Sequence, residues 1–513
     1  MKDIKARSNY WLTTIKNPPH YLPISIILLL AGGLYLWQLG QESLWIDELI
    51  SLERARNLNL YVPRIFYFVI LKFWMIWGNS DAWLRGLGVL FALGSVFFTY
   101  QLGCRLQGKT TALVAALLLA MSPLFIHHAQ EIRMYTASTF LSVAGTLLFT
   151  YVLENPRNRL IFGWAILRWL AIITTPLNAL MIAPDLVLFL WKYRHKKSAW
   201  LALGKGLLII AILWLPNFLP LVLKSVPQFM GGVKVPGTAV PTKGGYQSPN
   251  LLSFVTQLGR FSAWPFGRAN SEAIYQFYNC FSAILTALFG IALFKIRKSQ
   301  QLIWLTVWAL LPLVIIGLIA QVSRSLWVDR YLLFVAPYIF LLVAVGWQQV
   351  WQRWRFWAIF VAIIYAIAVS GGIKRYYSVA DRADWRGLVT AIVQQEQPQD
   401  VIVWSTGQAM TAALNHYYHG SAKIWSELPG PCSINSTKED MTQWIQNLPT
   451  DTSRMWLICT LSEENFPTFK QVIGEELELT NNQVFKGEQI GTVRTLNLFL
   501  GVAFESKEEV SSN

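Results

Sequence analysis

The sequence contains few charged residues and few cysteines. Charged side chains make up 14% of its 513 residues, whereas ordinary soluble domains carry about 25%. The four cysteines say little about the fold, and Cys104 and Cys280 lie in or beside apolar segments. Cys432 and Cys459 could pair if their part of the chain faces an oxidising compartment, and two free thiols fit the sequence equally well. The low charge excludes an ordinary soluble protein of this length.

Hydrophobic residues are abundant instead, and they lie in long runs. They make up 54% of the chain, and the 24 Trp and 19 Tyr suit the aromatic belts of membrane interfaces. Runs of roughly 17–25 apolar residues are typical of membrane spans. The sequence therefore predicts a polytopic α-helical membrane protein with about 11 transmembrane helices, at 22–39, 82–103, 110–126, 136–153, 160–174, 177–191, 201–223, 274–294, 302–320, 331–347 and 357–373.

The net charge of +15 is unevenly distributed. Residues 1–381 carry a balance of +22, spread among short loops between the apolar runs, whereas residues 382–513 carry −7. Basic residues in such loops are typical of membrane topology and argue against nucleic-acid binding. The basic start of the chain places the N-terminus in the cytoplasm, and an odd number of spans then places the C-terminal part outside the cytoplasmic membrane.

Two domains are expected from the change in composition. Residues 1–375 form a transmembrane domain with outer loops at 40–81, 127–135 and 224–273, and residues 376–513 form an extracytoplasmic α/β domain. Short strand-like runs at 401–404 and 455–459 alternate with helical stretches in the second domain. The Gly- and Pro-rich loop 224–273 could be a mobile lid or an ordinary surface loop. The tail pattern predicts helices at 382–396, 438–447 and 463–474.

The first outer loop begins with adjacent carboxylates at Asp47 and Glu48. Such a pair is often simply solvated. Here the aromatic segment 61–68 follows, and it predicts an interfacial amphipathic helix that would shelter the carboxylates from bulk water. Arg64 and Tyr67 lie in this segment, as candidate groups for a phosphate and for an acceptor or lid.

The second outer loop is dense in polar side chains. His127, His128 and Glu131 could ligate a divalent metal, but no further firm ligand is evident, and polar groups at a helix end explain them as well. Glu131 and Arg133 are interpreted as a second acid and an anion-binding group. His128 and Tyr135 are candidates for contacts with the acceptor. No metal or other cofactor is therefore predicted.

Arginines mark the start of a late span, at Arg324 and Arg330, the latter followed by Tyr331. The planar guanidinium can donate two hydrogen bonds to one phosphate. These side chains, with Arg64 and Arg133, predict a phosphate site at the membrane surface. Binding of lipid headgroups is the simpler alternative.

Five motifs in this order resemble the GT-C membrane glycosyltransferases that use polyprenyl-phosphate sugars. These include protein O-mannosyltransferases of glycosyltransferase family 39, aminoarabinose transferases and RgtA/B/C/D-like bacterial enzymes. The motifs are Trp45-Ile46-Asp47-Glu48, Gly78-Asn79-Ser80-Asp81-Ala82-Trp83-Leu84-Arg85, Ala129-Gln130-Glu131-Ile132-Arg133-Met134-Tyr135, Asp329-Arg330-Tyr331-Leu332 and Asp384-Trp385-Arg386.

The resemblance implies an inverting hexosyl or pentosyl transferase in a bacterial cytoplasmic membrane. It would move a sugar from a polyprenyl-phosphate donor to a hydroxyl on a lipid, polysaccharide or protein. Asp47 would be the essential carboxylate, and basic residues would hold the donor phosphate. The family's Lys-Pro-Pro segment is replaced by Val62-Pro63-Arg64, and its His-Tyr by Thr174-Thr175-Pro176.

A transporter or flippase of a lipid-linked sugar is the alternative. Transporters bind their cargo near the bilayer midplane. Only Arg168 and Asp185 are charged residues clearly inside predicted spans, whereas the other charges gather near the outer ends, which favours the enzyme.

Overall fold

The computed structural model describes two compact units. One, here the helical unit, comprises 1–39, 58–79 and 83–376, and the other, the tail unit, comprises 40–57, 80–82 and 377–513. The first predicted outer loop is therefore divided, and its start groups with the C-terminal part of the chain. The structure describes all residues except 1–20, 60–63, 231–248, 265–270, 295–298, 323–325, 380–381, 405–407, 426–438, 440–453, 460–470, 472–476, 490–491 and 504–513.

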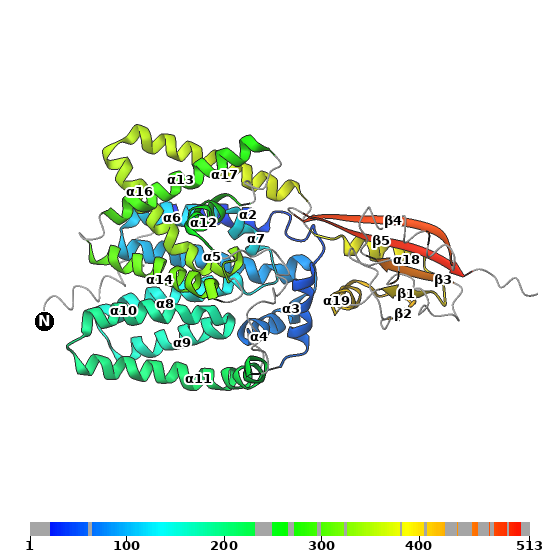
Figure 1. The fold of residues 1–513 in the computed structure, drawn as a ribbon, viewed down its shortest axis with the longest axis horizontal. Coiled ribbons are helices and arrows are strands. Elements are labelled where there is room, and N and C mark those ends of the chain that lie inside the picture. Colours follow the sequence, from blue (N-terminus) through cyan, green and yellow to red (C-terminus); the bar gives the residue numbers. More distant parts are fainter. Residues whose placement is uncertain are drawn as a thin grey trace, which may run out of the picture. The chain divides into compact units, whose positions relative to one another are not determined.

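Every predicted span coincides with one or more helices of the helical unit. In Figure 1 the helices α8, α9 and α11 lie side by side, and α13 packs against α16. The helices are α2 (Leu22–Leu36), α5 (Asp81–Leu106), α6 (Lys109–Ala120), α7 (Pro123–Ala129), α8 (Tyr135–Glu154), α9 (Asn158–Thr174), α10 (Ile182–Tyr193), α11 (Lys197–Met230), α13 (Glu272–Phe294), α14 (Gln300–Val322), α15 (Asp329–Leu332), α16 (Ala336–Arg353) and α17 (Arg355–Ser378).

Seven helices in the described residues are long and apolar enough to cross a membrane, and the bent pair α6–α7 would make eight. The two helices of that pair meet at 63°, where Pro123 cannot continue α6 and the Ser122 hydroxyl caps α7 by accepting from the amide of Phe125 at 3.2 Å. The predicted spans at α2, α9 and α10 have 15, 17 and 12 residues, fewer than the ~20 that cross a bilayer perpendicularly. The length criterion thus gives fewer spans than the eleven expected.

The predicted outer loop 127–135 is packed rather than exposed. Residues 129–134 are all buried. Gly88 of α5 lies so close to this turn that a Cβ atom at this position would be 2.6 Å from the carbonyl oxygen of Ala129, so only glycine fits. The turn therefore packs closely against α5.

The predicted loop 224–273 is helical over much of its described length. It contains the end of α11 and all of α12 (Leu251–Ala263), which begins with a capping box between Asn250 and Ser253. Helix α12 packs on α13 and α7. Its inner face is therefore part of the core, which does not suit a mobile lid, and residues 231–248 lie outside the described part.

Arg168 and Asp185 form an ion pair inside the helical unit, with both side chains fully buried. Nε of Arg168 lies 2.8 Å from Oδ2 of Asp185, and the guanidinium also donates to the carbonyl of Ser142 and the hydroxyl of Thr146. The indole N–H groups of Trp164 and Trp308 donate to the two carboxylate oxygens, each at 2.8 Å. The pair joins α9 and α10 to α8 and α14.

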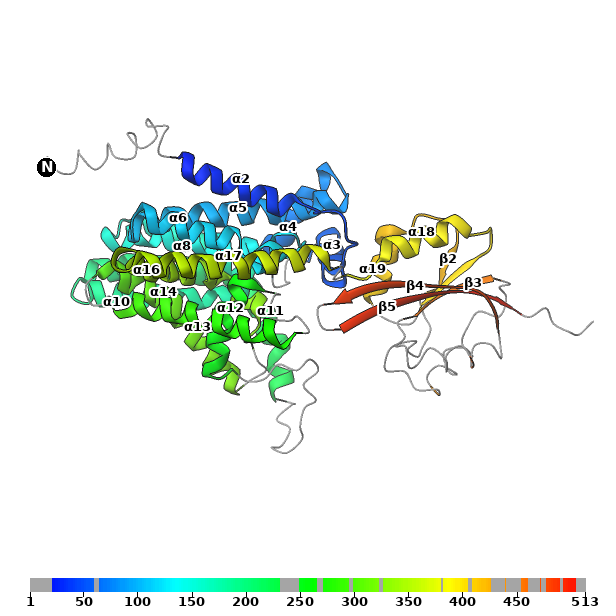
Figure 2. The same ribbon diagram turned by 90° about the horizontal axis from the view of Figure 1, so that it is seen from above.

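The tail unit contains a mixed five-stranded sheet with the order β2-β1-β3-β5-β4. Strand β1 is parallel to β2 and β3, whereas β5 is antiparallel to β3 and β4. Figure 2 shows α18 beside the sheet. The strands are β1 (Val401–Trp404), β2 (Lys423–Trp425), β3 (Arg454–Cys459), β4 (Leu477–Gln489) and β5 (Thr492–Ala503), and the helices are α3 (Ile46–Arg56), α18 (Trp385–Gln395) and α19 (Gln408–Tyr417).

Three tail segments agree with the expected positions, at 385–395, 401–404 and 454–459. The expected helices at 438–447 and 463–474 lie almost wholly outside the described residues.

Candidate functional site

The two acids of the first loop begin helix α3 and differ in their surroundings. Glu48 is fully buried, and its Oε2 accepts from the backbone amide of Trp45 at 3.1 Å and from Nη1 of Arg382 at 2.9 Å. Nε of Arg382 lies 3.4 Å from the carboxylate of Glu42. Asp47, by contrast, is half-buried. Glu48 therefore closes the first turn of the helix, whereas Asp47 is the more accessible of the two acids.

Asp81, from the second motif, is the centre of a polar network in the tail unit. Its Oδ2 accepts from the guanidinium of Arg386 and from the hydroxyl of Tyr417, the latter at 2.7 Å. Its Oδ1 lies 3.2 Å from Nε2 of His416. The second and fifth motifs thus meet through Asp81 and Arg386, although 305 positions separate them in the chain.

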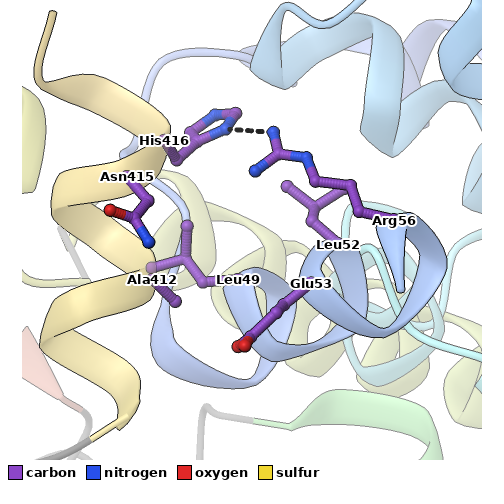
Figure 3. Close-up of a pocket in the computed structure, with 7 residues that line it drawn as sticks. All are labelled: Leu49, Leu52, Glu53, Arg56, Ala412, Asn415 and His416. Atoms are coloured by element: carbon purple, nitrogen blue, oxygen red, sulfur yellow. Dashed lines mark hydrogen bonds between the residues drawn. The ribbon is translucent and has the colours of Figure 1, made fainter. Parts of the chain in front are cut away.

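A small pocket of about 120 Å³ lies between α3 and α19. Figure 3 shows Leu49 and Leu52 at its apolar wall, with Arg56 hydrogen-bonded to His416 across it at 3.5 Å. An α-helix turns about 100° per residue, so Asp47 lies roughly on the opposite side of α3 from Leu52 and Arg56. The pocket is therefore separate from the Asp47 carboxylate.

In the helical unit His127, His128 and Glu131 form a compact cluster. Nε2 of His127 lies 3.2 Å from one oxygen of Glu131, and Nδ1 of His128 lies 2.8 Å from the other. Burial raises the pKa of Glu131, but the two histidines lower it by more, and the net pKa lies well below the ordinary value. The three potential ligand atoms lie within 4.8 Å of one another, so this donor set could hold a divalent cation such as Zn²⁺.

Two of the predicted phosphate-binding arginines lie near aromatic rings of the same unit. The guanidinium of Arg133 is 5.6 Å from the ring centre of Tyr135 and 3.4 Å from its hydroxyl. Arg330 lies 5.3 Å from the ring centre of Tyr331. The charge of Arg330 also acts on both His128 and Tyr135, so Arg133 and Arg330 form one cationic region beside the histidine cluster.

The remaining predicted site residues lie at separate places. Arg64 immediately precedes α4 (Ile65–Trp74) and has φ = 78°, which is uncommon for a residue with a Cβ atom. Tyr67 is fully buried in the helical unit, so its ring belongs to the core and does not suit a lid. Helix α4 starts at Ile65 and continues well beyond 68, and Arg324 lies outside the described residues.

Several residues of these clusters were not predicted. They are Arg382, His416 and Tyr417. No local pattern marks them, because their partners, at positions 42, 48 and 81, are more than 300 residues away. Only the Asp384-Trp385-Arg386 motif gave a signal in this region.

No protein-family model and no curated protein sequence matches the chain. Among solved structures it is similar to apo ArnT from Cupriavidus metallidurans, with a TM-score of 0.56 and 12% identity over 93% of this chain and 97% of that one. ArnT bound to undecaprenyl phosphate gives a TM-score of 0.55 with 96% and 98% coverage.

The archaeal oligosaccharyltransferase AglB from Archaeoglobus fulgidus, in complex with an inhibitory peptide and a dolichol-phosphate, gives a TM-score of 0.51. Its identity is 12%, over 93% of this chain and 74% of that one. The chain has the GT-C fold.

Proposed function

We propose that this chain is a membrane glycosyltransferase that moves a sugar from a polyprenyl-phosphate donor to an acceptor hydroxyl. The observation that carries the proposal is the likeness of fold to ArnT over 97% of that protein's length. ArnT has been solved with undecaprenyl phosphate and AglB with a dolichol-phosphate. Related lipid phosphates suit the cationic region around Arg133 and Arg330.

In the proposed reaction the Asp47 carboxylate removes the proton of the acceptor hydroxyl. The acceptor oxygen forms a bond to the anomeric carbon as the bond from that carbon to the phosphate oxygen breaks. The electron pair leaves with the polyprenyl phosphate, and a single displacement inverts the anomeric configuration. The reaction would take place on the outer side of the cytoplasmic membrane of a bacterium.

Arginines stabilise the charge that develops on the departing phosphate. We assign this role to Arg133 and Arg330, with Arg64 and Arg324 as further phosphate contacts and Tyr331 beside Arg330. His128 and Tyr135 border the same region and are assigned to the acceptor side. Glu131 holds the two histidines in place through its two oxygens.

The transporter alternative loses its main support because the intramembrane charges bind each other. Arg168 and Asp185 are fully buried, and each is hydrogen-bonded on several sides. Neither is available to bind a cargo.

The test uses full-length protein in liposomes with a labelled undecaprenyl-phosphate sugar and a bacterial envelope extract as acceptor. A glycosyltransferase releases undecaprenyl phosphate and labels the acceptor. Movement of the intact lipid across the bilayer without release would contradict the proposal and favour a carrier. A scaffold would do neither.

A further inference from the structure

The segment 40–44, which leads into α3, is held by hydrogen bonds and an ion pair to residues of the C-terminal tail. The carbonyl of Gly40 accepts from Nη2 of Arg386 at 3.1 Å. The hydroxyl of Ser43 accepts from the backbone amide of Arg386 at 3.0 Å and donates to Oδ1 of Asp384 at 3.2 Å. Asp384 in turn caps α18 through the amide of Gly387. The start of the first loop is therefore fastened to the first turn of a tail helix.

Two further contacts continue this attachment up to the acid pair. The amide of Leu44 donates to the hydroxyl of Tyr417 at 2.6 Å, and that hydroxyl donates to Asp81. Arg382 then spans Glu42 and Glu48, with its side chain almost fully buried. Of the five residues 40–44, four thus have a hydrogen-bond or ion-pair partner in the tail.

The geometry points to Arg382 as a positioning residue for the reaction: it clamps the first turn of α3 to the tail and so sets the direction of the adjacent Asp47 carboxylate. Oε2 of Glu48 accepts hydrogen bonds from both the Trp45 amide and the Arg382 guanidinium. Loss of Arg382 removes a charged hydrogen-bond donor from this fully buried carboxylate. The first turn then reorients to hydrate Glu48, and Asp47, one residue earlier, moves with it.

This inference rests on the proposed function for its kinetic test. A misplacement of a catalytic group by about 1 Å costs on the order of 100-fold in rate. Arg382→Met is therefore expected to lower kcat about 100-fold with the donor KM unchanged, and Arg382→Lys restores part of the loss. The matched control is Arg454→Met, which removes a tail arginine that pairs with Asp400 at 3.2 Å and donates to the carbonyl of Gln395 at 3.2 Å.

Hydrogen exchange on the full-length protein in nanodiscs gives a second readout that needs no activity. Arg382→Met is expected to raise amide exchange at 44–49 while residues 385–404 keep the wild-type pattern, and Arg454→Met leaves 44–49 unchanged. Unchanged exchange at 44–49 in Arg382→Met, or full kcat despite raised exchange there, overturns the inference. An inactive wild-type protein would instead overturn the proposed function, and the exchange result alone would then decide whether the clamp exists.

Discussion

Nη1 of Arg382 lies 2.9 Å from Oε2 of Glu48, which is fully buried beside the half-buried Asp47. The neighbouring acids of the first loop therefore have different tasks. One fixes the helix that begins at Ile46, and the other is assigned to proton transfer.

Glu48→Gln should destabilise the tail unit. The amide keeps the shape of the side chain but loses the charge that binds Arg382. Hydrogen bonds to charged groups contribute about 1.5–3 kcal/mol, and a loss of this size is expected. Thermal unfolding of the full-length protein followed by tryptophan fluorescence measures it. Glu53→Gln, which changes an exposed side chain of the same helix, should leave the transition unchanged, and equal shifts for both variants would refute the difference between the acids.

Arg330→Ala and Arg133→Ala should weaken donor binding. Each removes a charged donor from the cationic region, and a contribution of about 1.5–3 kcal/mol corresponds to a rise in donor KM of roughly 10- to 100-fold. Steady-state kinetics with a polyprenyl-phosphate sugar measures the change. Arg353→Ala, at the exposed end of α16, serves as the control. A donor KM that stays at the wild-type value in both variants would contradict the assignment of these arginines to donor binding.

Glu131→Gln should destabilise the helical unit in a pH-dependent way. The folded-state pKa of Glu131 is lowered, because the two histidines outweigh the effect of burial. Its ionised form therefore contributes stability that is fully present above the unfolded-state value of about 4.3 and is lost as the pH falls through the lower folded-state pKa. Wild type should exceed the variant in melting temperature at pH 6, and the difference should shrink below about pH 4. A difference that grows on acidification would contradict the assigned charge.

Arg168→Met should be among the most destabilising single changes in the helical unit. Removing one partner of a buried ion pair costs about 3–5 kcal/mol, whereas replacing both partners with apolar residues is often close to neutral. The double variant Arg168→Met/Asp185→Leu should therefore unfold nearer to wild type than Arg168→Met does, as a double-mutant cycle in urea would show. Additive losses would mean that the two side chains do not act as a pair.

Much of the helical unit could be predicted, because a long apolar run is a local signal that indicates a helix buried in lipid. The predicted spans 82–103 and 136–153 agree closely with α5 and α8. The bend between α6 and α7 was missed, although Ser122-Pro123 is a local signal for a new helix start. Helix α12 was not predicted, because the sequence on both sides of it is rich in Gly and Pro and is typical of a loop.

The site was less predictable because its contacts join distant parts of the chain. Asp81 and Asp384-Trp385-Arg386 could be singled out as motifs, but nothing local indicates that Asp81 and Arg386 form an ion pair. The opposite holds for His127, His128 and Glu131. Their spacing within one turn brings them together, so the sequence alone indicated a cluster.

The measurement that tests the central claim most directly is donor consumption by Asp47→Asn. The variant keeps the shape of the side chain but cannot accept the acceptor proton, so release of polyprenyl phosphate should fall to the background of protein-free liposomes. Expression and melting temperature should match wild type, since Glu48 and Arg382 still hold α3. Substantial release of polyprenyl phosphate by a correctly folded Asp47→Asn protein would contradict the account.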